Sequence, residues 1–512
     1  MGSQAALRMN VLKSIKCLVP ILVLGLYPIP WLNAQTFATL HSFTNGPDNN
    51  VEDAGLILSG NTLYGTTSKS GCSSNGSVFA INIDGTGFTN LYDFSPEVTN
   101  AAGSFTNSDG ANLSAGLILS GNTLYGTATF GGSSGAGTLF AVNTDGTDFT
   151  NLHNFTVGNV SGGTGTFTNG DGLHPGTRLI LLGSRLYGSV LGGGSSGWGT
   201  LFAINTDGTD FTNLYNFSAL SRRTFTNSDG AGPEALTLSS NTLYGTAQMG
   251  GTWGHGTMFA INIDGTDFTN LYNFSLGNFD IAVGAITNSD GINPRTDLIL
   301  SDNVLYETTS FGGTWGHGTV FAINTDGSDF MTLHSFAGGS DGANPNSGLV
   351  LSGNTLYGTT EFGGISNAGT IFAINTDGTG FTNLYSFSAG TANSQGTYTN
   401  SDGSNPESGL IVLGNTLYGK TQAGGIWGGG TVFNISLPLP QLTITPSGAN
   451  IILAWPTNVD GFDYSGFILQ STTNLVSSVG WGTNFPAPAI VNGQYAVTNP
   501  ISGSQMFYRL SK

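Results

Sequence analysis

The fold of this chain is decided by one short stretch, FATLHSF at residues 37–43. Stretches of this kind, most of them close to FTNLYNF, occur seven times and begin at Phe37, Phe88, Phe149, Phe211, Phe268, Phe330 and Phe381. The first copy precedes every other repeated motif, whereas the last repeat ends at VFNIS, residues 432–436, with no copy after it. We therefore expect residues 37–43 to supply the strand that the last repeat lacks.

Two other motifs recur between these copies in a fixed order. The first, GLILSGNTLYGT and its variants, places a tyrosine at Tyr64, Tyr125, Tyr187, Tyr244, Tyr306, Tyr357 and Tyr418. The second, GTVFAIN, is centred on Phe79, Phe140, Phe202, Phe259, Phe321, Phe372 and Phe433. Successive tyrosines are 51 to 62 residues apart. A fixed period with several strand signals per unit indicates a repeat architecture.

Each repeat is predicted to form four short strands. Ser-Gly-Asn joins the GLIL and TLYGT segments, and Asp-Gly-Thr joins VFAIN to FTNLY. Gly-Asn and Asp-Gly accept the positive φ angles of tight hairpins, so neighbouring strands should be antiparallel. Because consecutive residues in VFAI are all apolar, the sheets should be covered on both faces. Stacked propeller blades have this property.

We expect an all-β fold with a seven-bladed β-propeller over residues 35–436. Pairing of the N-terminal strand with the last repeat closes the ring and removes the open sheet edges that invite aggregation. A β-solenoid is the alternative, although it has no use for a displaced strand.

The repeat resembles a known family. Its columns, SGNTLYGTT followed by glycine pairs and GTVFAINTDGTGFTNLYSF, are similar to the GloVer-type (choice-of-anchor) tandem repeat over about residues 36–436. This resemblance implies an exported bacterial protein with β-propeller-like repeats. It implies no activity and no catalytic residues.

The N-terminal segment is predicted to be a signal peptide, residues 1–34. Arg8, Lys13 and Lys16 precede a short apolar run that ends before Ala34. Basic residues followed by a short apolar stretch and a small residue are typical of secretory signals. Three prolines in the run, together with its limited length, argue against a permanent transmembrane helix. The expected location is secreted or at the cell surface, with no membrane insertion after cleavage.

Charge limits the partners. Cleavage at Ala34 leaves nine basic and thirty acidic residues, a formal net charge of −21. Such a surface repels nucleic acid and anionic lipid headgroups. Cys72 is then the only cysteine, so no intramolecular disulfide is possible. We expect a monomer without cofactor or metal.

The C-terminal region differs from the repeats. A Pro-rich linker, residues 437–442, is followed by short strand signals in residues 443–512, including an apolar strand around Trp455. This pattern favours a small β-sandwich of the fibronectin or immunoglobulin type. Trp455 and Trp481 are interpreted as core residues.

Departures from the repeat are the candidate binding positions, since a unique site needs an asymmetric set of groups. A glycine column at the expected channel mouth becomes Arg178, Ala235 and Asp297 in the third to fifth units, with Glu234 and Arg295 beside it. The glycine-rich loops of the same face supply Trp and His. The candidate ligand-binding residues are Arg178, Trp198, Trp253, His255, Arg295, Asp297, Trp315 and His317.

A structural interpretation of these residues stays open. In it, Trp and His fill gaps between glycine loops, and Arg178 pairs with Asp297. The repeated Asp-Gly pairs, such as Asp229-Gly230, are interpreted as turns in which the carboxylate binds nearby backbone amides. His41, His153 and His334 replace tyrosine in the outer strand and are interpreted as packing residues. No metal, phosphate-loop or nucleophile motif is present.

The favoured function is an exported, non-catalytic binding or surface protein whose partner is a carbohydrate or another surface protein. The first alternative is an enzyme acting on polysaccharide, a glycoside hydrolase or lyase, with Asp297 and Glu234 at the channel mouth. The second is a structural surface-layer component. Variable loops on a rigid scaffold are where binding normally resides.

Overall fold

The computed structural model describes residues 35–44, 54–69, 73–101, 103–160, 166–459, 462–464, 466–473, 481–500 and 506–511. The expected signal peptide, residues 1–34, lies outside the described residues. Backbone contacts divide the chain into one unit of Phe37–Ile435 and a second that joins Ser436–Lys512 to Met1–Thr36. Strands dominate both units, and the one helix among the described residues is the 3₁₀ turn η1 (Gly339–Asp341).

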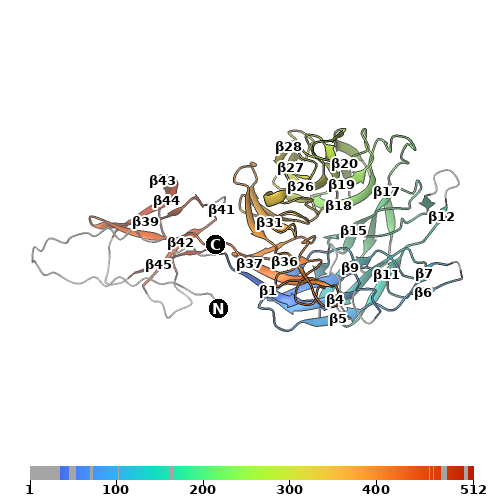
Figure 1. Ribbon diagram of the computed structural model, residues 1–512, viewed down its shortest axis with the longest axis horizontal. Helices are drawn as coiled ribbons and strands as arrows, with labels where there is room; N and C mark the ends of the chain where they lie inside the picture. Colours follow the sequence, from blue (N-terminus) through green and yellow to red (C-terminus); the bar gives the residue numbers. More distant parts are fainter. Residues whose placement is uncertain are drawn as a thin grey trace, which may run out of the picture. The chain divides into compact units, whose positions relative to one another are not determined.

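Unit Phe37–Ile435 is built from small antiparallel sheets, one for each repeat (Figure 1). The first three sheets each have four strands in chain order: β2 (Ile57–Ser59), β3 (Thr62–Thr67), β4 (Ser77–Asn82) and β5 (Thr89–Asp93); β8 (Ile118–Ser120), β9 (Thr123–Ala128), β10 (Thr138–Asn143) and β11 (Thr150–Asn154); β14 (Ile180–Leu182), β15 (Arg185–Val190), β16 (Thr200–Asn205) and β17 (Thr212–Asn216).

The next three sheets follow the same order, and the fifth adds a short strand, β24, beside β26. They comprise β18 (Ala231–Ser239), β19 (Thr242–Met249), β20 (Thr257–Asn262) and β21 (Thr269–Asn273); β24 (Ile292–Pro294), β25 (Ile299–Ser301), β26 (Val304–Phe311), β27 (Thr319–Asn324) and β28 (Met331–Ser335); β29 (Val350–Ser352), β30 (Thr355–Thr360), β31 (Thr370–Asn375) and β32 (Thr382–Ser386).

The sheet of the last repeat joins the two ends of this unit. Its strands are β35 (Ile411–Leu413), β36 (Thr416–Thr421), β37 (Thr431–Ser436) and, fourth, β1 (Phe37–Ser42). Phe37 lies opposite Ile435, and the amide of Phe43 donates to the carbonyl of Gly430 at 2.9 Å. Figure 1 draws β1 beside β37. The expected pairing of residues 37–43 with the last repeat is therefore present.

Aromatic stacks join the outer strand of each sheet to that of the next. Seven pairs stack with centroids 3.7–4.3 Å apart: His41–Phe88, Tyr92–Phe149, His153–Phe211, Tyr215–Phe268, Tyr272–Phe330, His334–Phe381 and Tyr385–Phe37. Each such pair contributes about 0.5–1.5 kcal/mol beyond burial. The packing role expected for His41, His153 and His334 is confirmed.

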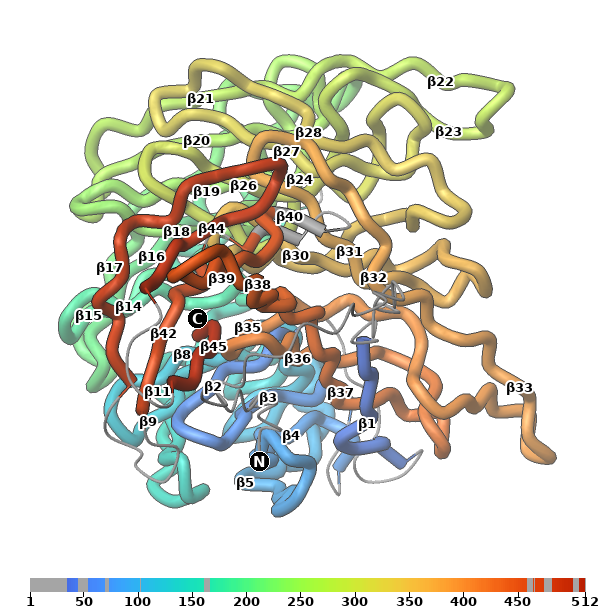
Figure 2. The backbone as a smooth tube through the Cα atoms, turned by 90° about the vertical axis from the view of Figure 1, so that its left-hand side faces the viewer, coloured from blue at the N-terminus to red at the C-terminus, as the bar shows by residue number. Residues whose placement is uncertain are grey.

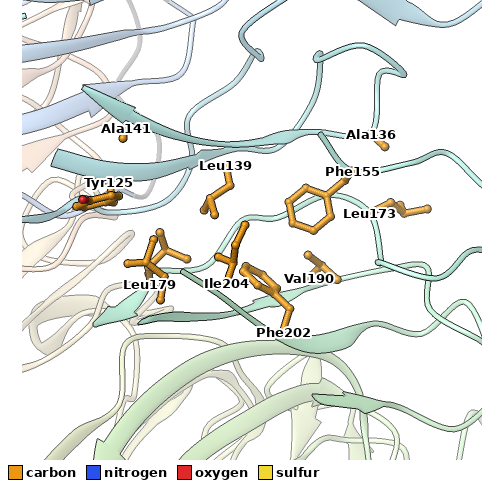
Figure 3. Packing of buried hydrophobic residues seen from close by; sticks show 11 residues of the cluster. Tyr125, Ala136, Leu139, Ala141, Phe155, Leu173, Leu179, Val190, Phe202 and Ile204 are labelled. Carbon is orange, nitrogen blue, oxygen red and sulfur yellow. The ribbon is translucent and has the colours of Figure 1, made fainter. Parts of the chain in front are cut away.

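The core lies between neighbouring sheets. Figure 3 shows Tyr125, Leu139 and Ala141 of the second sheet facing Leu179, Val190 and Ile204 of the third. The VFAI-type strands are mostly buried, as their apolar run predicts; Val78, Phe79 and Ile81 are fully buried. The tyrosine of the LYG motif in one unit, such as Tyr125, thus packs against the sheet of the next unit.

Extra hairpins extend some of the loops. They are β6 (Val98–Thr99) with β7 (Phe105–Thr106), β12 (Asn159–Val160) with β13 (Phe167–Thr168), β22 (Asn278–Asp280) with β23 (Ala285–Thr287), and β33 (Thr391–Ala392) with β34 (Tyr398–Thr399). Figure 2 shows β22–β23 and the β33 loop projecting from the body of this unit. The four-strand repeat does not predict these hairpins.

The second unit has strands of its own after residues 437–442, which form none. One sheet orders β38 (Thr443–Ser447), β39 (Asn450–Pro456), β44 (Gln494–Pro500) and β43 (Ala489–Val491). Two strand pairs accompany it: β40 (Asn458–Val459) with β41 (Phe462–Asp463), and β42 (Ile468–Thr472) with β45 (Phe507–Ser511). Trp455 is fully buried, as expected of a core residue, and Arg509 lies over the Trp481 ring.

Candidate functional site

The first strands of the repeats meet around a central cavity of about 330 Å³. Its lining includes the glycine column and its departures: Gly55, Gly116, Arg178, Asp297, Gly348 and Gly409. A methyl group added at Gly348 would lie 2.6 Å from the Cβ of Asp297. Because this approach is so close, a side chain at position 348 would require Asp297 to move.

The charged candidates gather at the mouth of this cavity. An adjoining space of about 170 Å³ is bordered by Arg178, Arg295 and Asp297, together with Glu234 and Glu407. Arg178 Nη1 lies 3.8 Å from Asp297 Oδ2, with the two side chains 49% and 46% exposed. A pair so open to solvent contributes about 0–1 kcal/mol. It nevertheless gives the Asp297 carboxylate a cationic partner.

A buried carboxyl group, Glu307, lies behind the mouth. Its Oε1 accepts hydrogen bonds of 3.2 Å from the Thr296 amide and the Thr246 hydroxyl, and its Oε2 is buried without a partner among the described residues. Burial raises the pKa of Glu307 well above its usual value; the two hydrogen bonds oppose this, and the nearby Asp297 and Glu234 carboxylates add to it. This environment therefore favours the protonated form of Glu307 more than water does.

Sequence reasoning passed over Glu307, although the sequence contains its signal. It occupies the glycine position of the LYG motif, which reads LYE in the fifth unit. At the equivalent Gly358, a Cβ would lie 2.6 Å from the Phe372 ring and 2.8 Å from a Leu349 methyl. A larger residue in this column must displace its neighbours, so Glu307 is a costly departure from the repeat.

A second buried ionisable side chain, Lys420, replaces threonine in the last unit. Its Nζ donates to the carbonyl of Thr66 at 3.0 Å and lies 5.9 Å from the centroid of Phe79. It therefore ties β36 of the last repeat to β3 of the first.

The tryptophan and histidine candidates lie elsewhere. Trp253 and Trp315 are 47% and 48% exposed on glycine-rich loops. Trp198 is half-buried, and its Nε1 has no hydrogen-bond partner within the described ranges. Neither these residues nor His255 and His317 are among the residues that line the central cavity. The structure thus unites Arg178, Arg295 and Asp297 and places the other five candidates apart from them.

Backbone bonds explain why the histidine column varies. The carbonyls of His255 and His317 accept from the amides of Asn293 and Asn344 at 3.0 and 2.9 Å, and Trp198 plays the same part toward Gly232. Because the carbonyl group of this residue makes the hydrogen bond to the next unit, the bond does not depend on which side chain the residue carries. Burial lowers the pKa of His255, which the Asp290 carboxylate partly opposes.

The repeated Asp-Gly aspartates are clamps between the two ends of a loop. Asp229 accepts from the Tyr215 hydroxyl at 3.0 Å and from the Ser218 amide at 2.9 Å, 11 residues upstream. The bound amide thus lies at the start of the loop and not within the turn, which corrects the expected turn chemistry. No group of three or more metal-binding side chains occurs in the described part of the chain.

Together, these features define an all-β repeat protein of small antiparallel sheets around a charged central cavity. The model of the Gloeobacter/Verrucomicrobia repeat matches residues 31–174 and 275–475, more than half of the chain. The protein belongs to this repeat family, which confirms the resemblance seen in the sequence.

Other comparisons are less specific. No curated protein matches the chain. Among solved structures, it is similar to the extracellular domain of a one-component system from B. thetaiotaomicron (11% identity, 82% of this chain and 45% of that one, TM-score 0.44). It is also similar to a europium-containing methanol dehydrogenase (11% identity, 78% of this chain and 93% of that one, TM-score 0.43). A third similar structure is an oligogalacturonate lyase in complex with manganese (9% identity, 79% of this chain and 97% of that one, TM-score 0.40). No described helix is long and apolar enough to cross a membrane.

Proposed function

We propose that the repeats form a seven-bladed β-propeller closed by β1, followed by a fibronectin-like sandwich of residues 443–512. The β1–β37 pairing and the stack of Phe37 on Tyr385 support closure. In a closed ring, the loops that precede the first strands share one face with the glycine-rich loops.

On this scaffold, we propose a secreted or cell-surface protein that binds carbohydrate without catalysis. The observation that carries the proposal is the exposure of Trp253, Trp315 and Trp427, at 47%, 48% and 55%, in one column of the glycine loops. Tryptophan is enriched at binding interfaces, where its large ring supplies contact area. Their flat faces can stack on the C–H faces of sugar rings.

The enzyme alternative is less favoured. Its leading carboxylate, Asp297, has Arg178 as a partner, and Glu307 is too deeply buried to meet a polymer. A structural surface-layer role does not explain why tryptophans are exposed at equivalent loop positions. The strong negative charge also disfavours nucleic acid as a partner.

A glycan array with the full chain and its Trp253→Ala and Trp315→Ala variants tests the proposal. We expect binding to a restricted set of glycans and a loss of at least threefold in signal in one of these variants. Trp455→Phe, a change in the buried core of the second unit, is the control and should bind as the unmodified chain does. An array without hits contradicts the proposal; cleavage of a bound glycan that Asp297→Asn abolishes favours the enzyme.

A further inference from the structure

A side cavity of about 430 Å³, larger than the central cavity, lies among the loops of the first three repeats. Ser74, Asn75, Ser134 and Ala136, which belong to the glycine-rich loops of the first two units, are part of its lining. Ligand pockets occupy about 300–1,000 Å³. The side cavity is therefore large enough for a small molecule.

Small residues occupy two loop columns at the side cavity. Ser134 is equivalent to Trp253 and Trp315, since all three follow a Gly-Gly-Ser or Gly-Gly-Thr start of the loop. Two positions on, Ala136 is equivalent to His255. The second unit thus has the small residues Ser134 and Ala136 at the positions where the fourth unit has Trp253 and His255.

The walls of the side cavity are aromatic and exposed. Phe105 and Phe167 come from the β6–β7 and β12–β13 hairpins, and Phe130 comes from the loop after β9; all three are exposed to solvent. His174 faces Phe130 with the ring centroids 4.9 Å apart, and burial lowers its pKa. The hairpins that the repeat pattern does not predict therefore supply two of the three phenylalanine walls.

The floor is rigid and the rim is polar. Ala136 and Leu173 belong to the buried cluster between the second and third sheets, as Figure 3 shows. Asn75 is held by a 2.6 Å hydrogen bond to the Ser95 carbonyl. The rim carries one basic and one acidic side chain, Lys69 and Glu97, in addition to hydroxyl and amide groups.

We propose that this side cavity is a binding site for a short neutral hexose oligosaccharide. Flat rings with apolar C–H faces fit between the phenylalanines, and their hydroxyl edges meet the polar rim. Because Lys69 and Glu97 carry opposite charges, the rim favours neither anionic nor cationic ligands. The acidic surface of the whole protein disfavours anionic sugars. This inference rests on the proposed carbohydrate binding and assigns it a second site, separate from Trp253 and Trp315.

Titration calorimetry of the full chain with cellotetraose, maltotetraose and laminaritetraose tests the assignment. Ser134→Trp places in the side cavity a residue that the same column accepts in other units, so the fold should persist. We expect at least one of the three sugars to bind the unmodified chain and to bind Ser134→Trp at least tenfold more weakly. Phe167→Ala, which removes an exposed wall, should weaken binding at least threefold.

Ser366→Trp is the matched control, because it makes the same substitution in the same column of the sixth unit, outside the cavity lining. It should bind as the unmodified chain does. Equal binding by all variants overturns the side-cavity assignment and leaves the proposed function intact. Hits on the glycan array without binding of these three sugars overturn the neutral hexose class. Failure of both assays overturns the proposed function itself.

Discussion

At the residue scale, the informative positions are those where one unit departs from the repeat. Most units place glycine at the third position of LYG, since the phenylalanine of the next strand covers that site, as Phe372 covers Gly358. Glu307 breaks this rule and is completely buried. A buried carboxyl is tolerated when it is neutral and hydrogen-bonded, and here only one of its two oxygens has a partner.

This burial predicts a pH-dependent stability. The folded protein retains a proton on Glu307 that the unfolded chain releases above the ordinary carboxyl pKa of about 4.3. The free energy of unfolding should therefore fall as pH rises above about 4.3, by up to about 1.4 kcal/mol per pH unit, until the pH reaches the raised folded-state pKa. Urea unfolding as a function of pH measures this slope.

Two variants isolate the contribution of Glu307. Glu307→Gln keeps the shape of the side chain and removes the ionisation, and Glu307→Gly restores the residue of the other units. Both variants should remove the part of the pH dependence of the unfolding free energy that Glu307 causes. If either variant loses stability with pH in parallel with the unmodified chain, the titrating group lies elsewhere.

At the element scale, β1 links two sheets besides its own. Phe37 stacks on Tyr385 of the sixth sheet, and His41 stacks on Phe88 of the first. The strand thus contributes both the hydrogen bonds of the last sheet and two of the seven stacks between sheets. A sheet edge left open at β37 would expose unpaired backbone groups to other chains.

Phe37→Ala should destabilise the repeat unit by about 2–4 kcal/mol, because it removes the stack with Tyr385 and the contact with Phe433. Ala38→Ser, at the adjacent exposed position of the same strand, should change stability by less than about 0.5 kcal/mol. Chemical denaturation followed by tryptophan fluorescence measures both. Equal stability of the two variants would show that β1 adds little to the fold.

At the scale of the whole molecule, the chain consists of two compact units whose cores are separate. Buried residues of the repeats cluster between neighbouring sheets, and Trp455 is among the buried residues of the second unit. The repeats should therefore fold without residues 437–512.

A truncated chain of residues 35–436 should remain soluble and unfold within about 5 °C of the corresponding transition in the full chain. Differential scanning calorimetry of the two proteins measures this, with the full chain showing an additional transition for residues 443–512. Aggregation of the truncated chain, or one shared transition in the full chain, would show that the two units stabilise each other.

The sequence by itself determined the four strands of each repeat, their hairpin turns and the pairing of residues 37–43 with the last repeat, because apolar runs, turn residues and the displaced FATLHSF stretch can be read from the sequence alone. It also singled out Arg178 and Asp297, whose column departs from glycine. The tertiary structure alone decided that Glu307 is buried without a full set of partners and that Ser134 lines a cavity. These properties depend on side chains from neighbouring units, which lie tens of residues away in the sequence and meet only when the sheets pack.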